Sequence, residues 1–366
     1  PFEAIEPRWK ILRVDGQSPL DRAFNPQTYP LAVPFRVSGT DEAVSAIPAD
    51  LALPTNRDPE KLTVLVMTGV TALSRHIGEV MEEKGVIYPA RDIHDWLTDA
   101  DLTHISNEVS FYQDCPKPGP LRADMRFCSH PKYIQLLEYA GTDIVELTGN
   151  HNLDWGFQPY FDTLEMYRQR GWKTFGGGAN LKEAQRPLYI EHNGNRLVFI
   201  GCSPAGPEAV WAAPDKPGSA PCQMDKLESE IQKQSAEGYL PIVTLQSFES
   251  DTYQPSVAQA APDFRRLARA GAVIVSGSAS HFPQTMTFVG SRFVHYGLGN
   301  LFFDQMTPPE TRQQFIDRHV FYDGRYLGVE LLTTLLEESA RPRPMTADER
   351  SAFLQEIFSL SDWSGE

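Results

Sequence analysis

Short apolar runs alternate with amphipathic stretches from Leu62 almost to the end of the chain. Continuous apolar runs predict strands buried on both faces, and apolar residues three or four positions apart predict helices. The predicted strands are residues 62–67, 143–147, 196–201, 241–245, 273–276 and 293–296. The predicted helices are residues 90–102, 129–141, 159–171 and 261–270, followed by a last helix that begins at the capping box from Thr346 to Glu349. This alternation indicates an α/β fold.

The first 57 residues have a different pattern and predict an arm, or the remnant of an upstream domain. Two short strands are expected there: residues 9–16, which end at an Asp-Gly turn, and residues 29–37, which prolines restrict to a sheet edge. The segment is too short and too rich in proline for a core of its own. We therefore divide the chain into this arm, residues 1–57, and one main domain, residues 58–366.

Composition and charge exclude several classes of protein. The chain has 33 Lys and Arg against 48 Asp and Glu, a formal net charge of −15. No clustered basic face of the kind that binds nucleic acid is visible. No run approaches the roughly 18 apolar residues of a membrane-spanning helix. The chain starts at Pro1 without a signal peptide, which predicts a mature or truncated piece.

The four cysteines form two pairs that are local in sequence, Cys115 with Cys128 and Cys202 with Cys222. Neither pair is a CxxC motif, which disfavours a zinc ribbon. Two interpretations remain: four independent buried thiols, or two disulfides formed in an oxidising compartment. We favour the disulfides, because each cysteine lies in a proline-rich loop or at a strand end, where a covalent link would hold the chain.

Polar residues follow directly after most of the predicted strands. Ligand-binding and catalytic groups of α/β sheets gather beyond the carboxyl ends of strands. We therefore expect one site where these strand ends meet. The segments concerned are residues 106–108, 148–156, 246–249, 277–281 and 297–300.

The order of these segments resembles that of the CapA family, capsule and poly-γ-glutamate synthesis proteins with the calcineurin-like metallophosphatase fold. The resemblance covers roughly residues 62–305. It implies a four-layer αββα sandwich, to which we add the short N-terminal arm with its predicted strands. The motifs that carry it are Asn107-Glu108, Gly149-Asn150-His151-x-x-Asp154-x-Gly156, the strand ending at Gln246, Gly277-x-x-x-His281-x-x-Gln284, and Tyr296-Gly297-Leu298-Gly299-Asn300-Leu301-Phe302.

Three motifs depart from the family pattern at positions where metallophosphatases hold metal. Val70 stands where the family has Asp, residues 246–248 read Gln-Ser-Phe in place of His-Trp-Gly, and residues 277–281 keep only the last histidine of Gly-His-His-Pro-His. A two-metal centre needs several carboxylate and imidazole ligands. Only Glu108, Asn150 and His281 remain, so we expect at most one weakly held divalent ion, manganese, zinc or iron, or none.

His151 and Asp154 have the spacing of an acid–base pair. A carboxylate that hydrogen-bonds an imidazole fixes its tautomer and raises its basicity, which suits proton transfer near neutral pH. The alternative is an ordinary turn in which Asp154 caps the next helix. Glu108 could likewise be only a solvated charge. The remaining expected site residues are those with a substrate-binding role: Asn107, Gln246, Asn300 and Arg75.

Three functions are compatible with these features. The resemblance implies an extracytoplasmic bacterial protein, at the cell surface or secreted, that acts in synthesis, release or anchoring of an anionic polymer such as poly-γ-glutamate, with a membrane-anchored synthesis complex as partner. The second function is a metal-free or single-metal hydrolase or epimerase on a peptide-like substrate. The third is a non-catalytic binding module. The acidity of the chain opposes a polyanionic substrate unless Arg75, Arg122 and Arg126 form a local positive patch.

Overall fold

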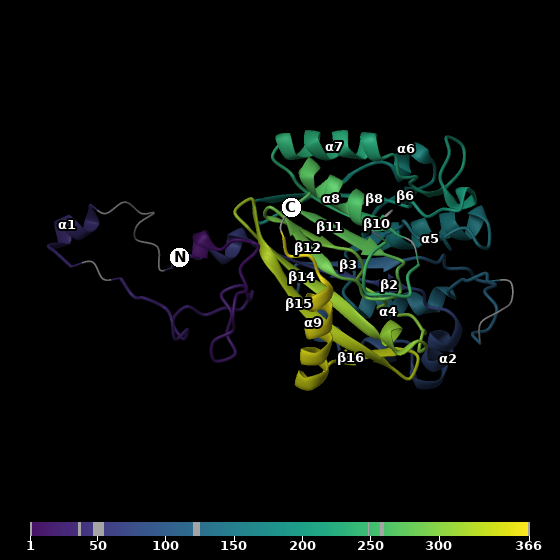
Figure 1. The fold of residues 1–366 in the computed structure, drawn as a ribbon, viewed down its shortest axis with the longest axis horizontal. Helices are drawn as coiled ribbons and strands as arrows, with labels where there is room; N and C mark the ends of the chain where they lie inside the picture. The colour runs from purple at the N-terminus through teal and green to yellow at the C-terminus, as the bar shows by residue number, and fades with distance from the viewer. Residues whose placement is uncertain are drawn as a thin grey trace.

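Two mixed sheets stack face to face in the computed structural model of the chain, and helices cover their outer faces (Figure 1). The structure describes residues 2–35, 38–46, 55–119, 125–247, 249–256 and 260–364. The larger sheet has the strand order β16-β15-β14-β1-β3-β4-β5, with β2 beside β3, and the smaller has the order β12-β13-β11-β10-β8-β7. A short ribbon pairs β6 with β9.

The strands and helices have the following bounds. Strands of the larger sheet are β1 (Leu62–Thr68), β2 (Val70–Thr71), β3 (Leu102–Asn107), β4 (Ile144–Glu146), β5 (Lys173–Phe175), β14 (Gln313–Tyr322), β15 (Arg325–Glu337) and β16 (Arg341–Pro344). The other strands are β6 (Gly177–Gly178), β7 (Leu188–His192), β8 (Asn195–Cys202), β9 (Gly218–Ser219), β10 (Leu240–Gln246), β11 (Ile274–Ser278), β12 (Met286–Val289) and β13 (Arg292–His295). The α-helices are α1 (Asp41–Ser45), α2 (Arg75–Lys84), α3 (His94–Thr98), α4 (Ile134–Tyr139), α5 (Phe157–Gln169), α6 (Leu181–Ala184), α7 (Met224–Ala236), α8 (Ala260–Ala270) and α9 (Ala347–Leu360).

Strand β1 illustrates why the predicted runs are continuously apolar. Leu65 and Met67 point into the core between the two sheets, whereas Val66 points into the core under helices α2 to α5. On the smaller sheet, Phe199 faces the inter-sheet core and Val198 faces the core under α7 and α8. Because successive side chains of a strand point to opposite faces, a strand buried on both sides needs apolar residues at every position. The four layers confirm the predicted αββα sandwich.

Parallel strands occupy the centre of each sheet. Strands β1, β3, β4 and β5 are parallel neighbours in the larger sheet, and β8, β10, β11 and β13 are parallel neighbours in the smaller one. Antiparallel strands complete both sheets. The carboxyl ends of the parallel strands carry the segments in which the sequence predicted a site.

Three predicted elements differ in the structure. The helix expected over residues 90–102 ends at Thr98, because Leu102 is the first residue of the buried strand β3. The helix expected from a Ser129 cap begins instead with a 3₁₀ turn capped by the His130 side chain, which accepts a hydrogen bond from the Lys132 N–H. The predicted arm strands are wrong for the described residues, where only a Val14–Gln17 bridge forms. In the second of them, Pro30 and Pro34 lack the N–H groups that a ladder would need.

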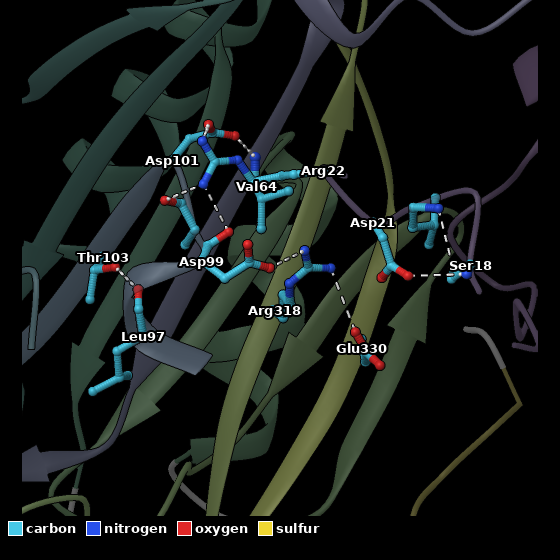
Figure 2. Close-up of polar contacts among 12 residues, drawn as sticks. Ser18, Asp21, Arg22, Val64, Leu97, Asp99, Asp101, Thr103, Arg318 and Glu330 are labelled. Atoms are coloured by element: carbon cyan, nitrogen blue, oxygen red, sulfur yellow. Dashed lines mark hydrogen bonds and ion pairs between the residues drawn. The ribbon is translucent and has the colours of Figure 1, made fainter. Parts of the chain in front are cut away.

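Residues 2–35 pack against the larger sheet through a small apolar cluster and a set of ion pairs. Phe2, Ile5 and Leu20 are buried with Leu62 and Val64 of β1. Figure 2 shows part of the polar contact, in which Arg22 of the arm pairs with Asp101 at 3.0 Å. Arg13 of the arm also pairs with Glu330 of β15 at 3.1 Å. Helix α1 lies at the far left of Figure 1, away from the sandwich. The arm is therefore fastened by its first residues.

Both predicted disulfides are present. Cys115 is bonded to Cys128 with their Cα atoms 5.9 Å apart, and Cys202 is bonded to Cys222 with a Cα separation of 5.1 Å. The second bond ties the end of β8 to the segment that precedes α7. In the described parts of the chain, no helix has the length and apolar character needed to cross a membrane.

Candidate functional site

The ends of β3, β4 and β10 bring three predicted site residues together. Glu108 follows β3 directly, Asn150 follows β4 by four residues, and Gln246 is the last residue of β10. The Gln246 amide nitrogen lies 3.4 Å from both the Glu108 Oε2 and the Asn150 Oδ1 atoms. The site therefore lies where the carboxyl ends of the two sheets meet.

Gly149 allows the segments after β3 and β4 to approach each other. A Cβ atom on Gly149 would lie 2.4 Å from the Cα atom of Glu108, closer than non-bonded carbon atoms can come. Next to this contact, Val109 and His151 form an isolated parallel bridge. Glycine at position 149 is therefore a steric requirement for placing His151 near Glu108.

His151 and Asp154 form the predicted pair. The Nδ1 atom of His151 lies 2.8 Å from Oδ2 of Asp154, and the same carboxylate accepts a hydrogen bond from the Phe127 backbone N–H at 2.8 Å. Both side chains are mostly buried but keep partial solvent contact. Asp154 thus orients the imidazole, and the Phe127 backbone orients Asp154.

Opposing effects set the charge of His151. Burial lowers the pKa of the imidazole, but the hydrogen bond with Asp154 and the negative charges of Glu108, Asp154 and Glu249 outweigh it, so the pKa is raised above its ordinary value. The protonated form is therefore favoured more than in a free histidine. Such a group can supply a proton at near-neutral pH.

A buried polar chain that the sequence analysis missed supports Gln246. The Ser278 hydroxyl donates to the Gln246 amide oxygen at 2.7 Å and lies 3.5 Å from Oε1 of Glu146. On its other side, the Glu146 carboxylate lies 3.2 Å from Nε2 of His104. Burial raises the pKa of Glu146. The contact with His104 and the hydrogen bond from the Thr148 hydroxyl lower the pKa by more than burial raises it, so the net shift is downward. The Glu146 carboxylate is thus the partner of His104.

His281 and Asn300 form a separate contact. The Nδ1 atom of His281 lies 2.7 Å from Oδ1 of Asn300, and the imidazole stacks on Phe303 with ring centroids 4.7 Å apart. The Asn300 amide donates to the Thr311 carbonyl and to the Gln305 side chain. Within the described residues, no hydrogen bond or ion pair joins His281 to Glu108, Asn150 or Gln246.

Asn107 and Arg75 are held by the fold. The Asn107 amide donates to the Val109 carbonyl at 2.7 Å and to the Tyr167 hydroxyl at 2.8 Å, and the residue is buried. Its geometry, like that of Asn300, is that of a structural residue and not of one that contacts substrate. Arg75 makes a two-point ion pair with Asp304. Of the other two arginines in the expected patch, Arg126 is described and Arg122 lies outside the described residues.

The predicted metal ligands do not form a ligand set in this geometry. The Gln246 amide N–H group points at both oxygens, of Glu108 and Asn150, that a cation would need, and His281 is bonded elsewhere. Among the residues that the structure describes, no group of three His, Cys, Asp or Glu side chains could hold an ion. The donor set therefore does not fit a divalent metal, and we derive no chemical step through one.

The sequence of the chain is similar to those of capsule synthesis proteins. The chain is 24% identical over 306 residues to the capsule biosynthesis protein CapA of Bacillus anthracis, covering 82% of this chain and 74% of the relative. It is 22% identical to the PGA biosynthesis protein CapA of Bacillus subtilis, covering 81% of this chain and 78% of that protein. Among solved structures, the calcineurin-like phosphoesterase YfkN from Bacillus subtilis has a TM-score of 0.46 and 11% identity, covering 81% of this chain and 97% of that one.

The model of one protein family matches residues 64–305, the stretch that runs from β1 past the His281–Asn300 contact. That is more than half of the chain, and its limits agree with those of the resemblance found in the sequence. The chain therefore belongs to the family of the bacterial capsule synthesis protein PGA_cap.

Proposed function

We propose that this chain is an extracytoplasmic CapA-like protein that acts in the synthesis, release or anchoring of an anionic surface polymer such as poly-γ-glutamate. The names of the relatives support the polymer, since one is a PGA biosynthesis protein. The two disulfides support an oxidising location outside the cytoplasm. A membrane-anchored synthesis complex would be its partner.

The observation that carries the proposal is the His151–Asp154 pair beside Glu108. Poly-γ-glutamate is joined by amide bonds, and amide cleavage requires a base for the attacking water and an acid for the leaving nitrogen. In our proposal Glu108 takes a proton from water, whose oxygen then bonds to the carbonyl carbon. The protonated imidazole of His151 gives its proton to the nitrogen as the C–N bond breaks. Release of polymer would follow directly from this step.

The experiment is incubation of the purified protein with poly-γ-glutamate, with polymer length followed by size-exclusion chromatography. We expect cleavage to fall by about 10²–10⁴-fold in His151→Asn, the usual contribution of a positioned acid or base. His94→Asn is the matched control, since His94 lies on α3 in the outer helix layer. Addition of manganese or of a chelator should leave the rate unchanged.

Two results would overturn the proposal in different ways. Binding of polymer without any cleavage by the wild-type protein would remove the acid–base role and favour the binding-module alternative. Absence of both binding and cleavage would remove the polymer itself as the substrate.

A further inference from the structure

A pocket of about 250 Å³ lies beside the Cys115–Cys128 disulfide, between α2 and the segment that precedes the site. Its charged lining residues are all basic: Arg75, Lys117 and Arg126, with His130 at the wall. Within the described residues no Asp or Glu lines it, although the chain as a whole carries a net charge of −15. A concentration of positive charge in an acidic protein indicates an anionic ligand.

Two of these basic side chains, Lys117 and Arg126, are not engaged in an ion pair within the described chain. Arg75 is already paired with Asp304. Arg126 uses its Nε atom to donate to the Asp154 backbone carbonyl at 2.8 Å and stacks its guanidinium 4.3 Å over the Trp155 ring. No carboxylate of the described chain forms an ion pair with Arg126 or Lys117. These two residues can therefore bind an anion without giving up an internal partner.

The pocket walls are held in place before any ligand arrives. Pro118 packs so closely on α2 that a Cβ atom on Gly78 would lie 2.8 Å from its ring. The disulfide joins the Cys115 wall to the Cys128 wall, and the Tyr112 N–H donates to the Ser129 carbonyl at 2.8 Å beside it. A preorganised pocket binds with less loss of conformational entropy.

The pocket and the acid–base pair share residues. Phe127 lines the pocket, and its backbone N–H donates to the Asp154 carboxylate while its ring contacts the His151 ring edge to face, with centroids 4.6 Å apart. Arg126 also lines the pocket and holds the Asp154 backbone. Phe127 thus contacts both the pocket and the His151 ring.

We propose that this pocket binds one free α-carboxylate of an acidic, γ-linked glutamate polymer through Lys117 and Arg126. The pocket is smaller than the roughly 300–1,000 Å³ of sites for drug-sized molecules, so it suits one unit of the chain. Binding there holds the next units over Phe127 and positions an amide bond at His151. This inference rests on the proposed function and identifies where its substrate is held.

The test is fluorescence anisotropy of a labelled γ-linked glutamate oligomer with the purified protein. We expect Lys117→Ala and Arg126→Gln each to weaken binding about tenfold, the usual loss for a hydrogen bond to a charged group. Arg126→Lys should retain most of the affinity, because it keeps the charge. The matched control is Lys226→Ala on α7, which removes the same charge from an exposed site and should bind as wild type.

The variants also separate this inference from the function on which it rests. Wild-type binding that survives in the Lys117→Ala, Arg126→Gln double variant would overturn the pocket and leave the proposed function standing. Absence of wild-type binding would overturn the proposed function first. An oligomer whose free α-carboxylates are amidated and that binds as tightly as the acidic one would also contradict the pocket. In cleavage assays, Lys117→Ala should raise KM and leave kcat unchanged, because Lys117 makes no contact with the acid–base pair.

Discussion

His151 meets two requirements of a proton-transfer residue: its imidazole ring is held in one orientation, and its pKa is raised so that the protonated form is favoured. Orientation comes from Asp154, which is itself fixed by the Phe127 N–H. The bias comes from carboxylates that outweigh the effect of burial on its pKa. Neither requirement depends on a metal, which agrees with the amide of Gln246 lying between Glu108 and Asn150.

We predict that Asp154→Asn lowers the pKa of His151 relative to the wild type, because burial remains while the negative charge of Asp154 is lost. NMR titration of the imidazole protons in both proteins measures this shift. Because the folded pKa of His151 is raised, its contribution to stability is complete below about pH 6.5 and is lost as the pH rises through the folded pKa. The difference in unfolding free energy between wild type and His151→Asn should therefore shrink on going to alkaline pH. An unchanged pKa in Asp154→Asn would contradict the electrostatic account.

At the scale of elements, β4 and β11 are joined through polar side chains in an otherwise apolar interior. Glu146 ends β4 in the larger sheet and contacts Ser278 at the end of β11 in the smaller one. His104 of β3 lies 3.2 Å from the other oxygen of this carboxylate. These hydrogen-bonded side chains hold together the strand ends next to Gln246 and Asn150.

We predict that Glu146→Ala lowers the free energy of unfolding by about 3–5 kcal/mol, the usual cost of removing one partner of a buried pair. Glu138→Ala on the exposed side of α4 removes the Arg170 ion pair and should cost about 0–1 kcal/mol. Chemical denaturation followed by circular dichroism gives both values. An equal decrease in the free energy of unfolding in the two variants would show that the buried Glu146 contact stabilises the fold no more than an exposed ion pair does.

Local patterns were sufficient for most elements and insufficient for the contacts between them. The apolar run at residues 62–67 and the capping box at Thr346 correspond to β1 and α9 as the structure has them. The helix expected over residues 90–102 was extended too far because apolar spacing does not distinguish a helix end from the start of a buried strand. Gln246 and Glu108 are 138 residues apart in sequence, so only the packing of the two sheets reveals their contact. The contacts of Phe127 with Asp154 and His151 are likewise visible only in the structure, because its apolar side chain gives no sign in the sequence of a role at the site.

At the scale of the whole molecule, the arm packs on the sandwich through its first part and again at Arg57, which is buried and donates hydrogen bonds to the carbonyls of Pro19 and Asp21. Leu20 is buried against β1, whereas Leu31 and Phe35 are 65% and 92% exposed. The ion pairs of Arg22 with Asp101, drawn in Figure 2, and of Arg13 with Glu330 join the arm to the larger sheet beside the buried part. Attachment therefore depends on a small apolar cluster reinforced by charges.

We predict that Leu20→Ala destabilises this attachment by about 2–5 kcal/mol, the range for large-to-small changes in a core. Limited proteolysis should then cut the arm faster, while the sandwich resists. Leu31→Ala is the matched control, and its exposed side chain should change the cleavage rate little. Equal rates for the two variants would mean that the cluster does not hold the arm.

The Cys115–Cys128 bond has a consequence for when the protein can act. The bond joins two walls of the basic pocket, so a newly made chain whose thiols are still reduced has no covalent link between those walls. Thiols remain reduced in a typical bacterial cytosol and pair after export. In the extracytoplasmic location that we propose, the bond would form after export and link the two pocket walls where the polymer is found. We therefore expect the reduced chain to bind acidic peptides poorly during its synthesis, and the oxidised chain to bind them once the two walls are linked.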